Sequence, residues 1–224
     1  MSFFSRKSKP INTSLEILVS QELNNIVISN SLNRSIYIQM DMIQLTKNDL
    51  ATLRIMKPTL VKNIESIVAK FYENLEKENS LGKIINQNSS INSLRTALNG
   101  HISEMFNGHI DKEFMKKRFK IAFVHAKIGL EPKWYMSAFQ DLLNGFFSIV
   151  QQTHFNHEEQ LKIINFEQLI VLEAHEKHHQ EALKKMTSQK LQDLVDESCT
   201  QVLATDSSFE KIVGLMNTIK FLNN

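Results

Sequence analysis

The sequence predicts an all-α fold, and three observations support this prediction. The 224-residue chain contains only six Gly and three Pro, so few residues break helices. Apolar side chains recur at spacings of three and four along most of the chain, as on the buried face of a helix. No segment shows a clear strand pattern; residues 37–45 alternate only loosely, and we interpret them as an extended lead-in segment. Six to eight helices are expected.

The first part of the chain predicts an N-terminal extension over residues 1–35, with one short amphipathic helix between Leu15 and Ile26. Thr46 is placed to cap a short helix that runs through Met56. Pro58 suits the first turn of a second helix, because the first N–H groups of a helix have no partner within it.

Residues 86–90 form a polar stretch that predicts a loop ending in Ser90, a good helix cap. The helix after it is expected to end at Gly108. Asp111 caps the next predicted helix, Gly129 closes it, and Pro132 opens another.

Two later segments are apolar around most of their circumference, within residues 132–152 and 156–183. A helix that is apolar on several sides is buried on several sides, so these segments predict a homodimer interface built as a four-helix bundle. Residues 184–224 are more polar, and their apolar residues at threes and fours indicate a coiled-coil helix that begins an output region.

Composition excludes several classes of protein. A net charge of +2 without a basic stripe argues against nucleic acid as partner, and no apolar run is long enough to span a bilayer. The lone Cys199 rules out an intramolecular disulfide and favours a cytoplasmic location. The chain lacks a Gly-rich phosphate loop, a serine nucleophile elbow and paired zinc cysteine motifs, so we do not expect an enzyme.

Two side chains suit a haem site. His125 follows Ile121 by one helical turn on a largely apolar helix, and a haem iron needs a neutral imidazole presented from a rigid element. From spacing alone, a core histidine bonded to a carbonyl is the more common case. Tyr72 lies in the apolar stripe of Val68 and Leu75, where its hydroxyl would need a partner; a tyrosine at the core edge is the alternative.

The other histidines are less informative. His101 lies one turn after Ala97 and two after Leu94, so it could be a distal group or second iron ligand, or a half-exposed residue at a helix flank. His175 and His179 share a helix face, with His178 beside them, but no cysteine or carboxylate pattern completes a zinc site. A solvated helix face is the expected role of these three residues.

The chain resembles the globin-coupled sensor family in four motifs that keep the family's order and spacing. Within this family the chain resembles the sensor domain of the soluble haem-based aerotaxis transducers of bacilli, over about residues 44–175. The motifs are FYENL at 71–75, HISEMF at 101–106, IAFVHAKIGL at 121–130 and PKWYMSAF at 132–139. The resemblance implies a sensor globin domain over residues 36–183 that binds haem b and dimerises.

The same resemblance implies roles for individual residues. His125 falls on the proximal iron ligand, and Tyr72 on the distal tyrosine that bonds a bound gas. Phe71 and Leu94 fall on neighbours that pack against the haem. Tyr135 falls on a proximal tyrosine that supports the ligand histidine.

Two departures from the family bear on the choice of ligand. Ala97 stands where the closest members place a distal threonine, with Thr96 adjacent but pointing about a quarter-turn away. Asn88 stands where they place a histidine. These changes affect oxygen selectivity more than haem binding, so CO or NO joins O2 as a candidate ligand.

The expected function is a haem-based oxygen sensor that signals through a dimer to an output such as aerotaxis. The coil begins shortly before Asn224, so we expect either a longer transducer or a short chain whose output comes from a partner. The alternatives are a haem-free sensory globin of a stress-signalling assembly and a globin that turns over NO or peroxide.

Overall fold

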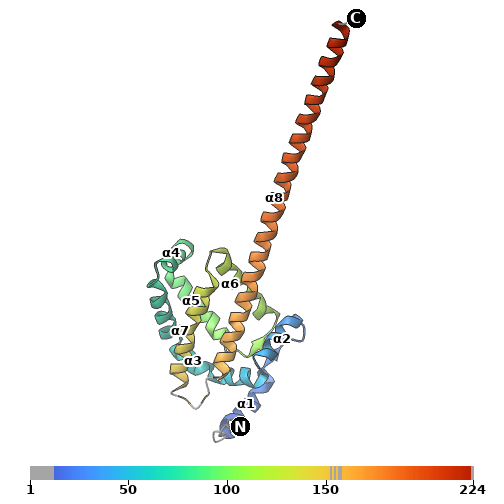
Figure 1. Ribbon diagram of the computed structural model, residues 1–224. Coiled ribbons are helices and arrows are strands. Elements are labelled where there is room, and N and C mark those ends of the chain that lie inside the picture. The colour runs from blue at the N-terminus through green and yellow to red at the C-terminus, as the bar shows by residue number, and fades with distance from the viewer. Residues whose placement is uncertain (1–12, 152, 154, 156–157, 223–224) are drawn as a thin grey trace, which may run out of the picture. The chain divides into compact units, whose positions relative to one another are not determined.

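The computed structural model describes residues 13–151, 153, 155 and 158–222, and these residues are mainly helical (Figure 1). The chain divides into two compact units, Met1–Glu176 and Lys177–Asn224. The helices among the described residues are α1 (Thr13–Glu22), η1 (Leu23–Asn25, a 3-10 turn), α2 (Arg34–Met42), α3 (Lys47–Glu76), α4 (Asn79–Asn88), α5 (Ile91–Met105), α6 (Lys112–Lys127), α7 (Pro132–Val150) and α8 (Glu158–Leu222). The all-α class predicted from the sequence is confirmed.

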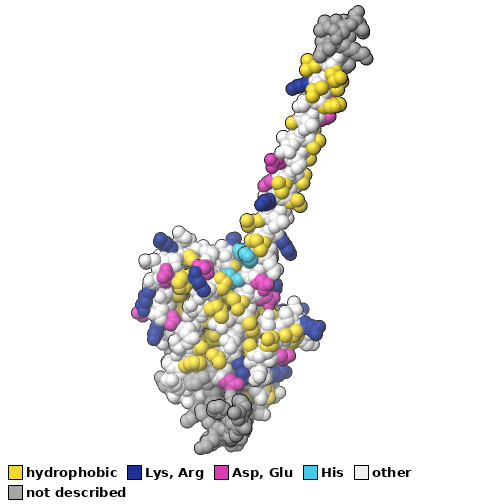
Figure 2. Space-filling model, viewed as in Figure 1, with side chains coloured by type: hydrophobic (Ala, Val, Ile, Leu, Met, Phe, Trp, Pro, Cys, Tyr) yellow, Lys and Arg dark blue, Asp and Glu magenta, His cyan; other side chains and the backbone are white. Residues whose placement is uncertain are grey.

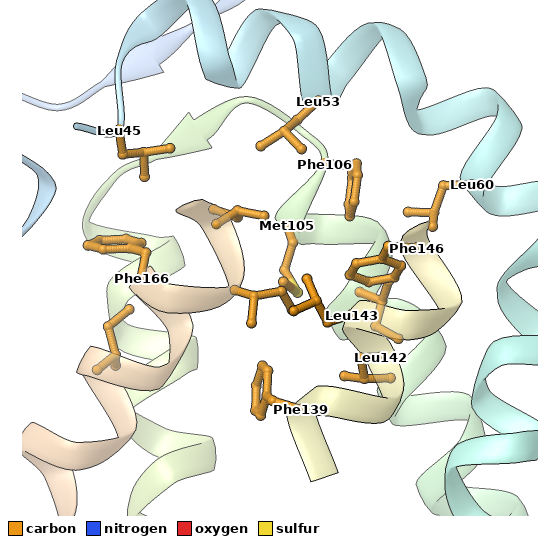
Figure 3. Close-up of a cluster of buried hydrophobic side chains, with 14 of the residues drawn as sticks. Leu45, Leu53, Leu60, Met105, Phe106, Phe139, Leu142, Leu143, Phe146 and Phe166 are labelled. Atoms are coloured by element: carbon orange, nitrogen blue, oxygen red, sulfur yellow. The ribbon is translucent and has the colours of Figure 1, made fainter. Parts of the chain in front are cut away.

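The core of the first unit lies where α3 packs against α5 and α7, with the first turns of α8 beside them. Figure 3 shows Leu53 and Leu60 of α3 facing aromatic side chains of the neighbouring elements. Phe106 and Phe146 meet edge to face, with ring centroids 5.4 Å apart. Burial of these large side chains removes much apolar surface from water and holds the helices in place.

Most of the predicted helix ends are confirmed. The side chain of Thr46 accepts a hydrogen bond from the Asp49 amide and closes a capping box with that residue. Ser90 and Asp111 likewise cap α5 and α6, and Pro132 begins α7. These signals are local, because each cap joins residues only three positions apart.

The prediction of two helices around Pro58 is wrong, because α3 continues through this residue from Lys47 to Glu76. Proline in a helix removes one backbone hydrogen bond and crowds the preceding turn. The buried side chains of Leu53, Met56, Leu60 and Ile64 flank Pro58 on the core side. Their packing holds both halves of the helix on one core, and this contribution outweighs the local penalty.

Two further expectations about the N-terminal half are corrected. Residues 34–42 form α2 instead of an extended segment, since the Asn33 side chain caps the helix and Ile36 and Met40 are buried one turn apart. Residues 86–88 belong to α4 instead of a loop, because the Glu78 side chain accepts from the Ser80 amide and starts a helix there. Residues 1–12 of the predicted N-terminal extension lie outside the described residues.

A two-stranded parallel sheet, absent from the sequence prediction, joins β1 (Val27–Ile28) to β2 (His109–Ile110). Strands of two residues are too short to show a pattern. Gly108 precedes β2 with φ of +73°, and a Cβ atom there would lie 2.5 Å from Cδ1 of Ile26. Glycine is therefore required both for the backbone conformation and for the close approach of β1.

The second unit, Lys177–Asn224, is helical over its described residues. Large apolar side chains are exposed along it, as Figure 2 shows in yellow. Leu191, Val195, Val202, Phe209 and Met216 are among them. Their spacing agrees with the coiled-coil pattern expected from the sequence, whose pairing with another helix stays a prediction.

Candidate functional site

His125 lies in the last turn of α6, where the sequence after it forms a specific helix end. Gly129 adopts φ of +80° and donates its amide to the Ala126 carbonyl at 3.1 Å. The Leu130 amide reaches back to the His125 carbonyl at 3.0 Å. These two bonds make a Schellman motif, which fixes the turn that carries His125. The Ile-Gly-Leu sequence at 128–130 thus ends the helix in a defined conformation and holds the turn that carries His125.

The imidazole of His125 is half-buried and neutral. Burial is the main cause that lowers its pKa to about 4, and the nearby His101 and His175 lower the pKa further. The Nδ1 atom is buried and has no hydrogen-bond partner among the described residues. A buried polar nitrogen without a partner is unusual and calls for an explanation. A neutral imidazole is also the form that coordinates a metal.

Tyr135 of α7 lies beside His125, with ring centroids 5.2 Å apart and planes inclined by 57°. Its other neighbour is Phe139, at a centroid distance of 4.6 Å. Burial, and next the charge of Glu167, raises the pKa of Tyr135 well above its usual value, so the phenol keeps its proton. The structure therefore brings together the two residues that the sequence assigned to the proximal side.

Tyr72 is buried on α3 and makes an edge-to-face contact with Phe71, at a centroid distance of 5.1 Å. Burial raises the pKa of Tyr72 to about 12, and the positive charge of Arg95 on α5 opposes this change. The Nε atom of Arg95 is buried and has no hydrogen-bond partner among the described residues. The sequence analysis did not identify Arg95 as a site residue. Its position next to Leu94, a predicted site residue, was the signal that could have indicated it.

The other residues predicted on α5 are less enclosed. Leu94 is half-buried and packs against the core. Thr96 is exposed, and its hydroxyl donates to the Asn92 carbonyl at 3.0 Å. Ala97 is exposed as well. Asn88, at the end of α4, donates its side-chain amide to the Ile84 carbonyl at 2.8 Å. The structure thus does not bring Thr96 or Asn88 to Tyr72 by any hydrogen bond.

His101 is engaged by two other helices. Its Nδ1 atom lies 3.0 Å from Nη1 of Arg118, and its Nε2 atom lies 3.5 Å from Oε2 of Glu167. Because a guanidinium only donates, Nδ1 accepts and the ring proton is assigned to Nε2. Both ring nitrogens of His101 therefore face this charged network.

The histidines on α8 differ in exposure: His175 and His178 are half-buried, and His179 is exposed. Across the part of the chain that the structure describes, no group of three or more histidine, cysteine, aspartate or glutamate side chains is placed to hold a metal ion. No described helix is long and apolar enough to cross a membrane.

A helical unit with a neutral histidine at the end of one helix and a buried tyrosine on another is compatible with a globin. A family model for Protoglobin matches residues 32–181, and the chain belongs to this family. Among solved structures, the globin domain of the Geobacter sulfurreducens globin-coupled sensor is similar, with 18% sequence identity and a TM-score of 0.58. That match covers 62% of this chain and 96% of the Geobacter chain. The expected resemblance to globin-coupled sensors is confirmed.

A globin family implies a haem, and the residues around His125 fit one. The Nδ1 atom of His125 has no hydrogen-bond partner among the described residues, so the ring is not committed to another protein group through this atom. The elements that carry the predicted site residues also carry half-buried apolar side chains that pack against the core, among them Phe71 of α3, Leu94 and Leu98 of α5, and Leu130 after α6. A small cavity lies elsewhere, lined by Met56, Phe146 and Gln160 among others, and touches none of the predicted site residues.

The burial of His125 predicts an acid-sensitive apoprotein. Histidine in an unfolded chain takes up a proton near pH 6.5, whereas His125 does so only near pH 4. The unfolded chain therefore binds more protons between these values, and stability falls as the pH drops through this window. The expected loss is roughly 2 kcal/mol, measured by urea unfolding at pH 7 and pH 4.5. His125→Gln should lose less than the wild type, while His179→Gln, at an exposed position, should match it.

Proposed function

We propose that this protein is a haem-based gas sensor that binds O2, with CO and NO as further ligands. The single observation that carries the proposal is the half-buried, neutral imidazole of His125, whose buried Nδ1 atom has no hydrogen-bond partner among the described residues and whose ring lies beside Tyr135. A haem b held by such an imidazole supplies an open iron position for a diatomic gas. His125 would be the iron ligand, and Tyr135 would fix the orientation of its ring.

The opposite side of the site would be formed by α3 and α5. The Tyr72 hydroxyl keeps its proton, because the pKa of this residue is raised to about 12. It can therefore donate a hydrogen bond to a polar ligand at any physiological pH. Phe71 and Leu94 would pack around it, and the exposed residues Ala97 and Thr96 are further candidates for contact with the haem or its ligand. The Arg95 charge beside Tyr72 favours ligands that carry negative charge.

The sensor domain is proposed to comprise residues 36–183, close to the matched residues 32–181, between an extension over 1–35 and a signalling helix over 184–224. Most apolar side chains of α7 are buried within the chain, whereas Leu161 and Leu172 of α8 are 41% exposed. A homodimer through residues 132–152 and 156–183 would cover these two leucines. Sedimentation equilibrium measures the mass of the protein in solution and so tests directly whether it is a dimer.

The proposed role is sensory and not enzymatic, in the cytoplasm, with aerotaxis as a candidate output and no nucleic acid as partner.

The first experiment is a haem titration of the purified chain, followed by absorption spectra of the ferric, ferrous, O2, CO and NO forms. A Soret band that moves with each gas is expected. Absence of a Soret band would favour a haem-free sensory globin, and steady turnover of NO or peroxide would favour an enzyme.

Tyr72→Phe tests the distal assignment. Loss of one hydrogen bond to a polar ligand is expected to speed O2 dissociation by about tenfold to a hundredfold, which corresponds to about 1.5–3 kcal/mol. CO accepts hydrogen bonds weakly, so its dissociation should change much less. Stopped-flow replacement of each gas gives both rates. Tyr37→Phe is the matched control, because the Tyr37 hydroxyl donates to the Ser29 carbonyl and Tyr37 is not among the predicted site residues. Equal effects of the two substitutions would place the donor elsewhere.

A further inference from the structure

A buried charged network joins α5, α6 and α8, and none of the proposed ligand contacts uses it. At its centre is Arg118 of α6, whose Nε donates to Oε1 of Glu167 on α8 at 2.6 Å. Nη1 of Arg118 donates to Oε2 of Glu104 at 3.1 Å and to Nδ1 of His101 at 3.0 Å. Nη2 donates to the His101 carbonyl at 3.1 Å. One planar guanidinium thus fixes three helices relative to one another.

Stability alone does not account for this arrangement. The side chains of Arg118 and Glu167 are each only 1% exposed, so both charges are fully removed from water. The cost of that removal commonly cancels the attraction between buried partners, and apolar residues of similar size are often as stable. The pair does fix the relative position of the two side chains, since the Arg–carboxylate bond tolerates little change in geometry.

The network lies next to both residues of the proximal side. Arg118 precedes His125 by seven residues, which is about two turns, so both project from the same face of α6. Glu167 acts on the Tyr135 hydroxyl through its negative charge. Any shift of α6 relative to α8 must therefore bend or break the bond between Arg118 and Glu167.

We propose that Arg118 and Glu167 are positioning residues that set the orientation of His125 against Tyr135, and that their ion pair carries a displacement of α6 into α8. The second part rests on the proposed function, because the displacement arises when a gas binds. Glu167 lies within α8, which runs from Glu158 to Leu222, and the second unit starts ten positions later, at Lys177. A helix held by its own hydrogen bonds passes such a displacement along its length.

The test uses the full chain with Arg118 and Glu167 both replaced by Met, which removes the charges and keeps most of the volume. Arg118→Lys keeps the positive charge but lacks the planar guanidinium group, so it tests whether charge alone restores the wild-type behaviour. The matched control is Lys162→Met, since Lys162 also ties α8 to a neighbouring helix, through Asp49 of α3 at 2.9 Å. This second pair joins a different helix of the core and leaves Arg118 untouched.

Two readouts separate positioning from a merely structural role. In the apoprotein, the ring resonances of His125 in NMR spectra should shift in the double Met variant and stay unchanged in Lys162→Met. In the haem-loaded protein, amide hydrogen exchange over residues 177–216 is compared with and without CO. The wild type and Lys162→Met should show a CO-dependent difference, and the double Met variant should show one at least fourfold smaller while still binding CO. Arg118→Lys should recover only part of it.

Other results overturn the inference. Unchanged His125 resonances in the double Met variant exclude a positioning role. A CO-dependent exchange difference of wild-type size in that variant excludes the ion pair as the link to α8. A wild type that takes up no haem defeats the proposed function and the link together, while the NMR comparison still decides whether Arg118 and Glu167 position His125.

Discussion

Replacing Arg118 alone with Met is expected to lower the free energy of unfolding by about 3–5 kcal/mol, whereas the double replacement of Arg118 and Glu167 should recover most of that loss. The single substitution strands the carboxylate of Glu167, whose side chain is 1% exposed. His101, 3.5 Å from that carboxylate, is then the remaining nearby group that could offset its charge. In the double variant no charge is stranded, and two flexible apolar side chains fill the space.

The measurement is urea unfolding of the apoproteins, with the four variants treated as a double-mutant cycle. A coupling energy of several kcal/mol is expected for Arg118 and Glu167. The ion pair of Arg54 and Glu22 gives a surface comparison, because its side chains are 34% and 25% exposed. Its coupling energy should be below about 1 kcal/mol. Additive losses in the Arg118–Glu167 cycle would mean that volume and shape, not charge pairing, set the stability there.

Helix ends were predictable from the sequence because their causes are local. Ser90, Asp111 and Gly129 each act within about five residues of their own position, and the structure has each of them where the sequence placed it. Pro58 was misjudged because its local preference competes with packing that no short window contains. The pairing of Val27 with His109 could not be predicted, since the two residues meet only when the fold is complete.

The site residues likewise fall into those that local sequence reveals and those that only the complete fold brings together. His125 and Tyr135 were found because they stand in two motifs that nearly adjoin, and the Schellman turn between the two residues is encoded by their neighbours. Glu167 was hidden in a segment interpreted only as apolar, 49 residues from its partner Arg118. The visible signal was a charged residue on the face of α6 that also carries His125. A charge at such a position indicates a buried partner, but the sequence does not say which one.

Replacing His125 with Gly is expected to weaken haem binding on the order of a hundredfold or more. Loss of a group that only supports a metal ligand already costs about tenfold to a hundredfold, and His125 is proposed as the ligand itself. The substitution also leaves a space of imidazole size beside Tyr135, whose ring is 5.2 Å from that of His125. Imidazole added to the solution should therefore enter this space and restore the Soret band of the wild type.

The measurement is a haem titration followed by absorption at increasing imidazole concentration, with His179→Gly as a matched control at an exposed position of α8. The control should bind haem as the wild type does and should not respond to imidazole. Recovery of the spectrum would assign the iron to the position of the His125 ring, because free imidazole can replace only what the side chain supplied. If His125→Gly kept the wild-type affinity, another residue would hold the iron. His101 would be the first to test, although releasing its ring would require the network around Arg118 to open.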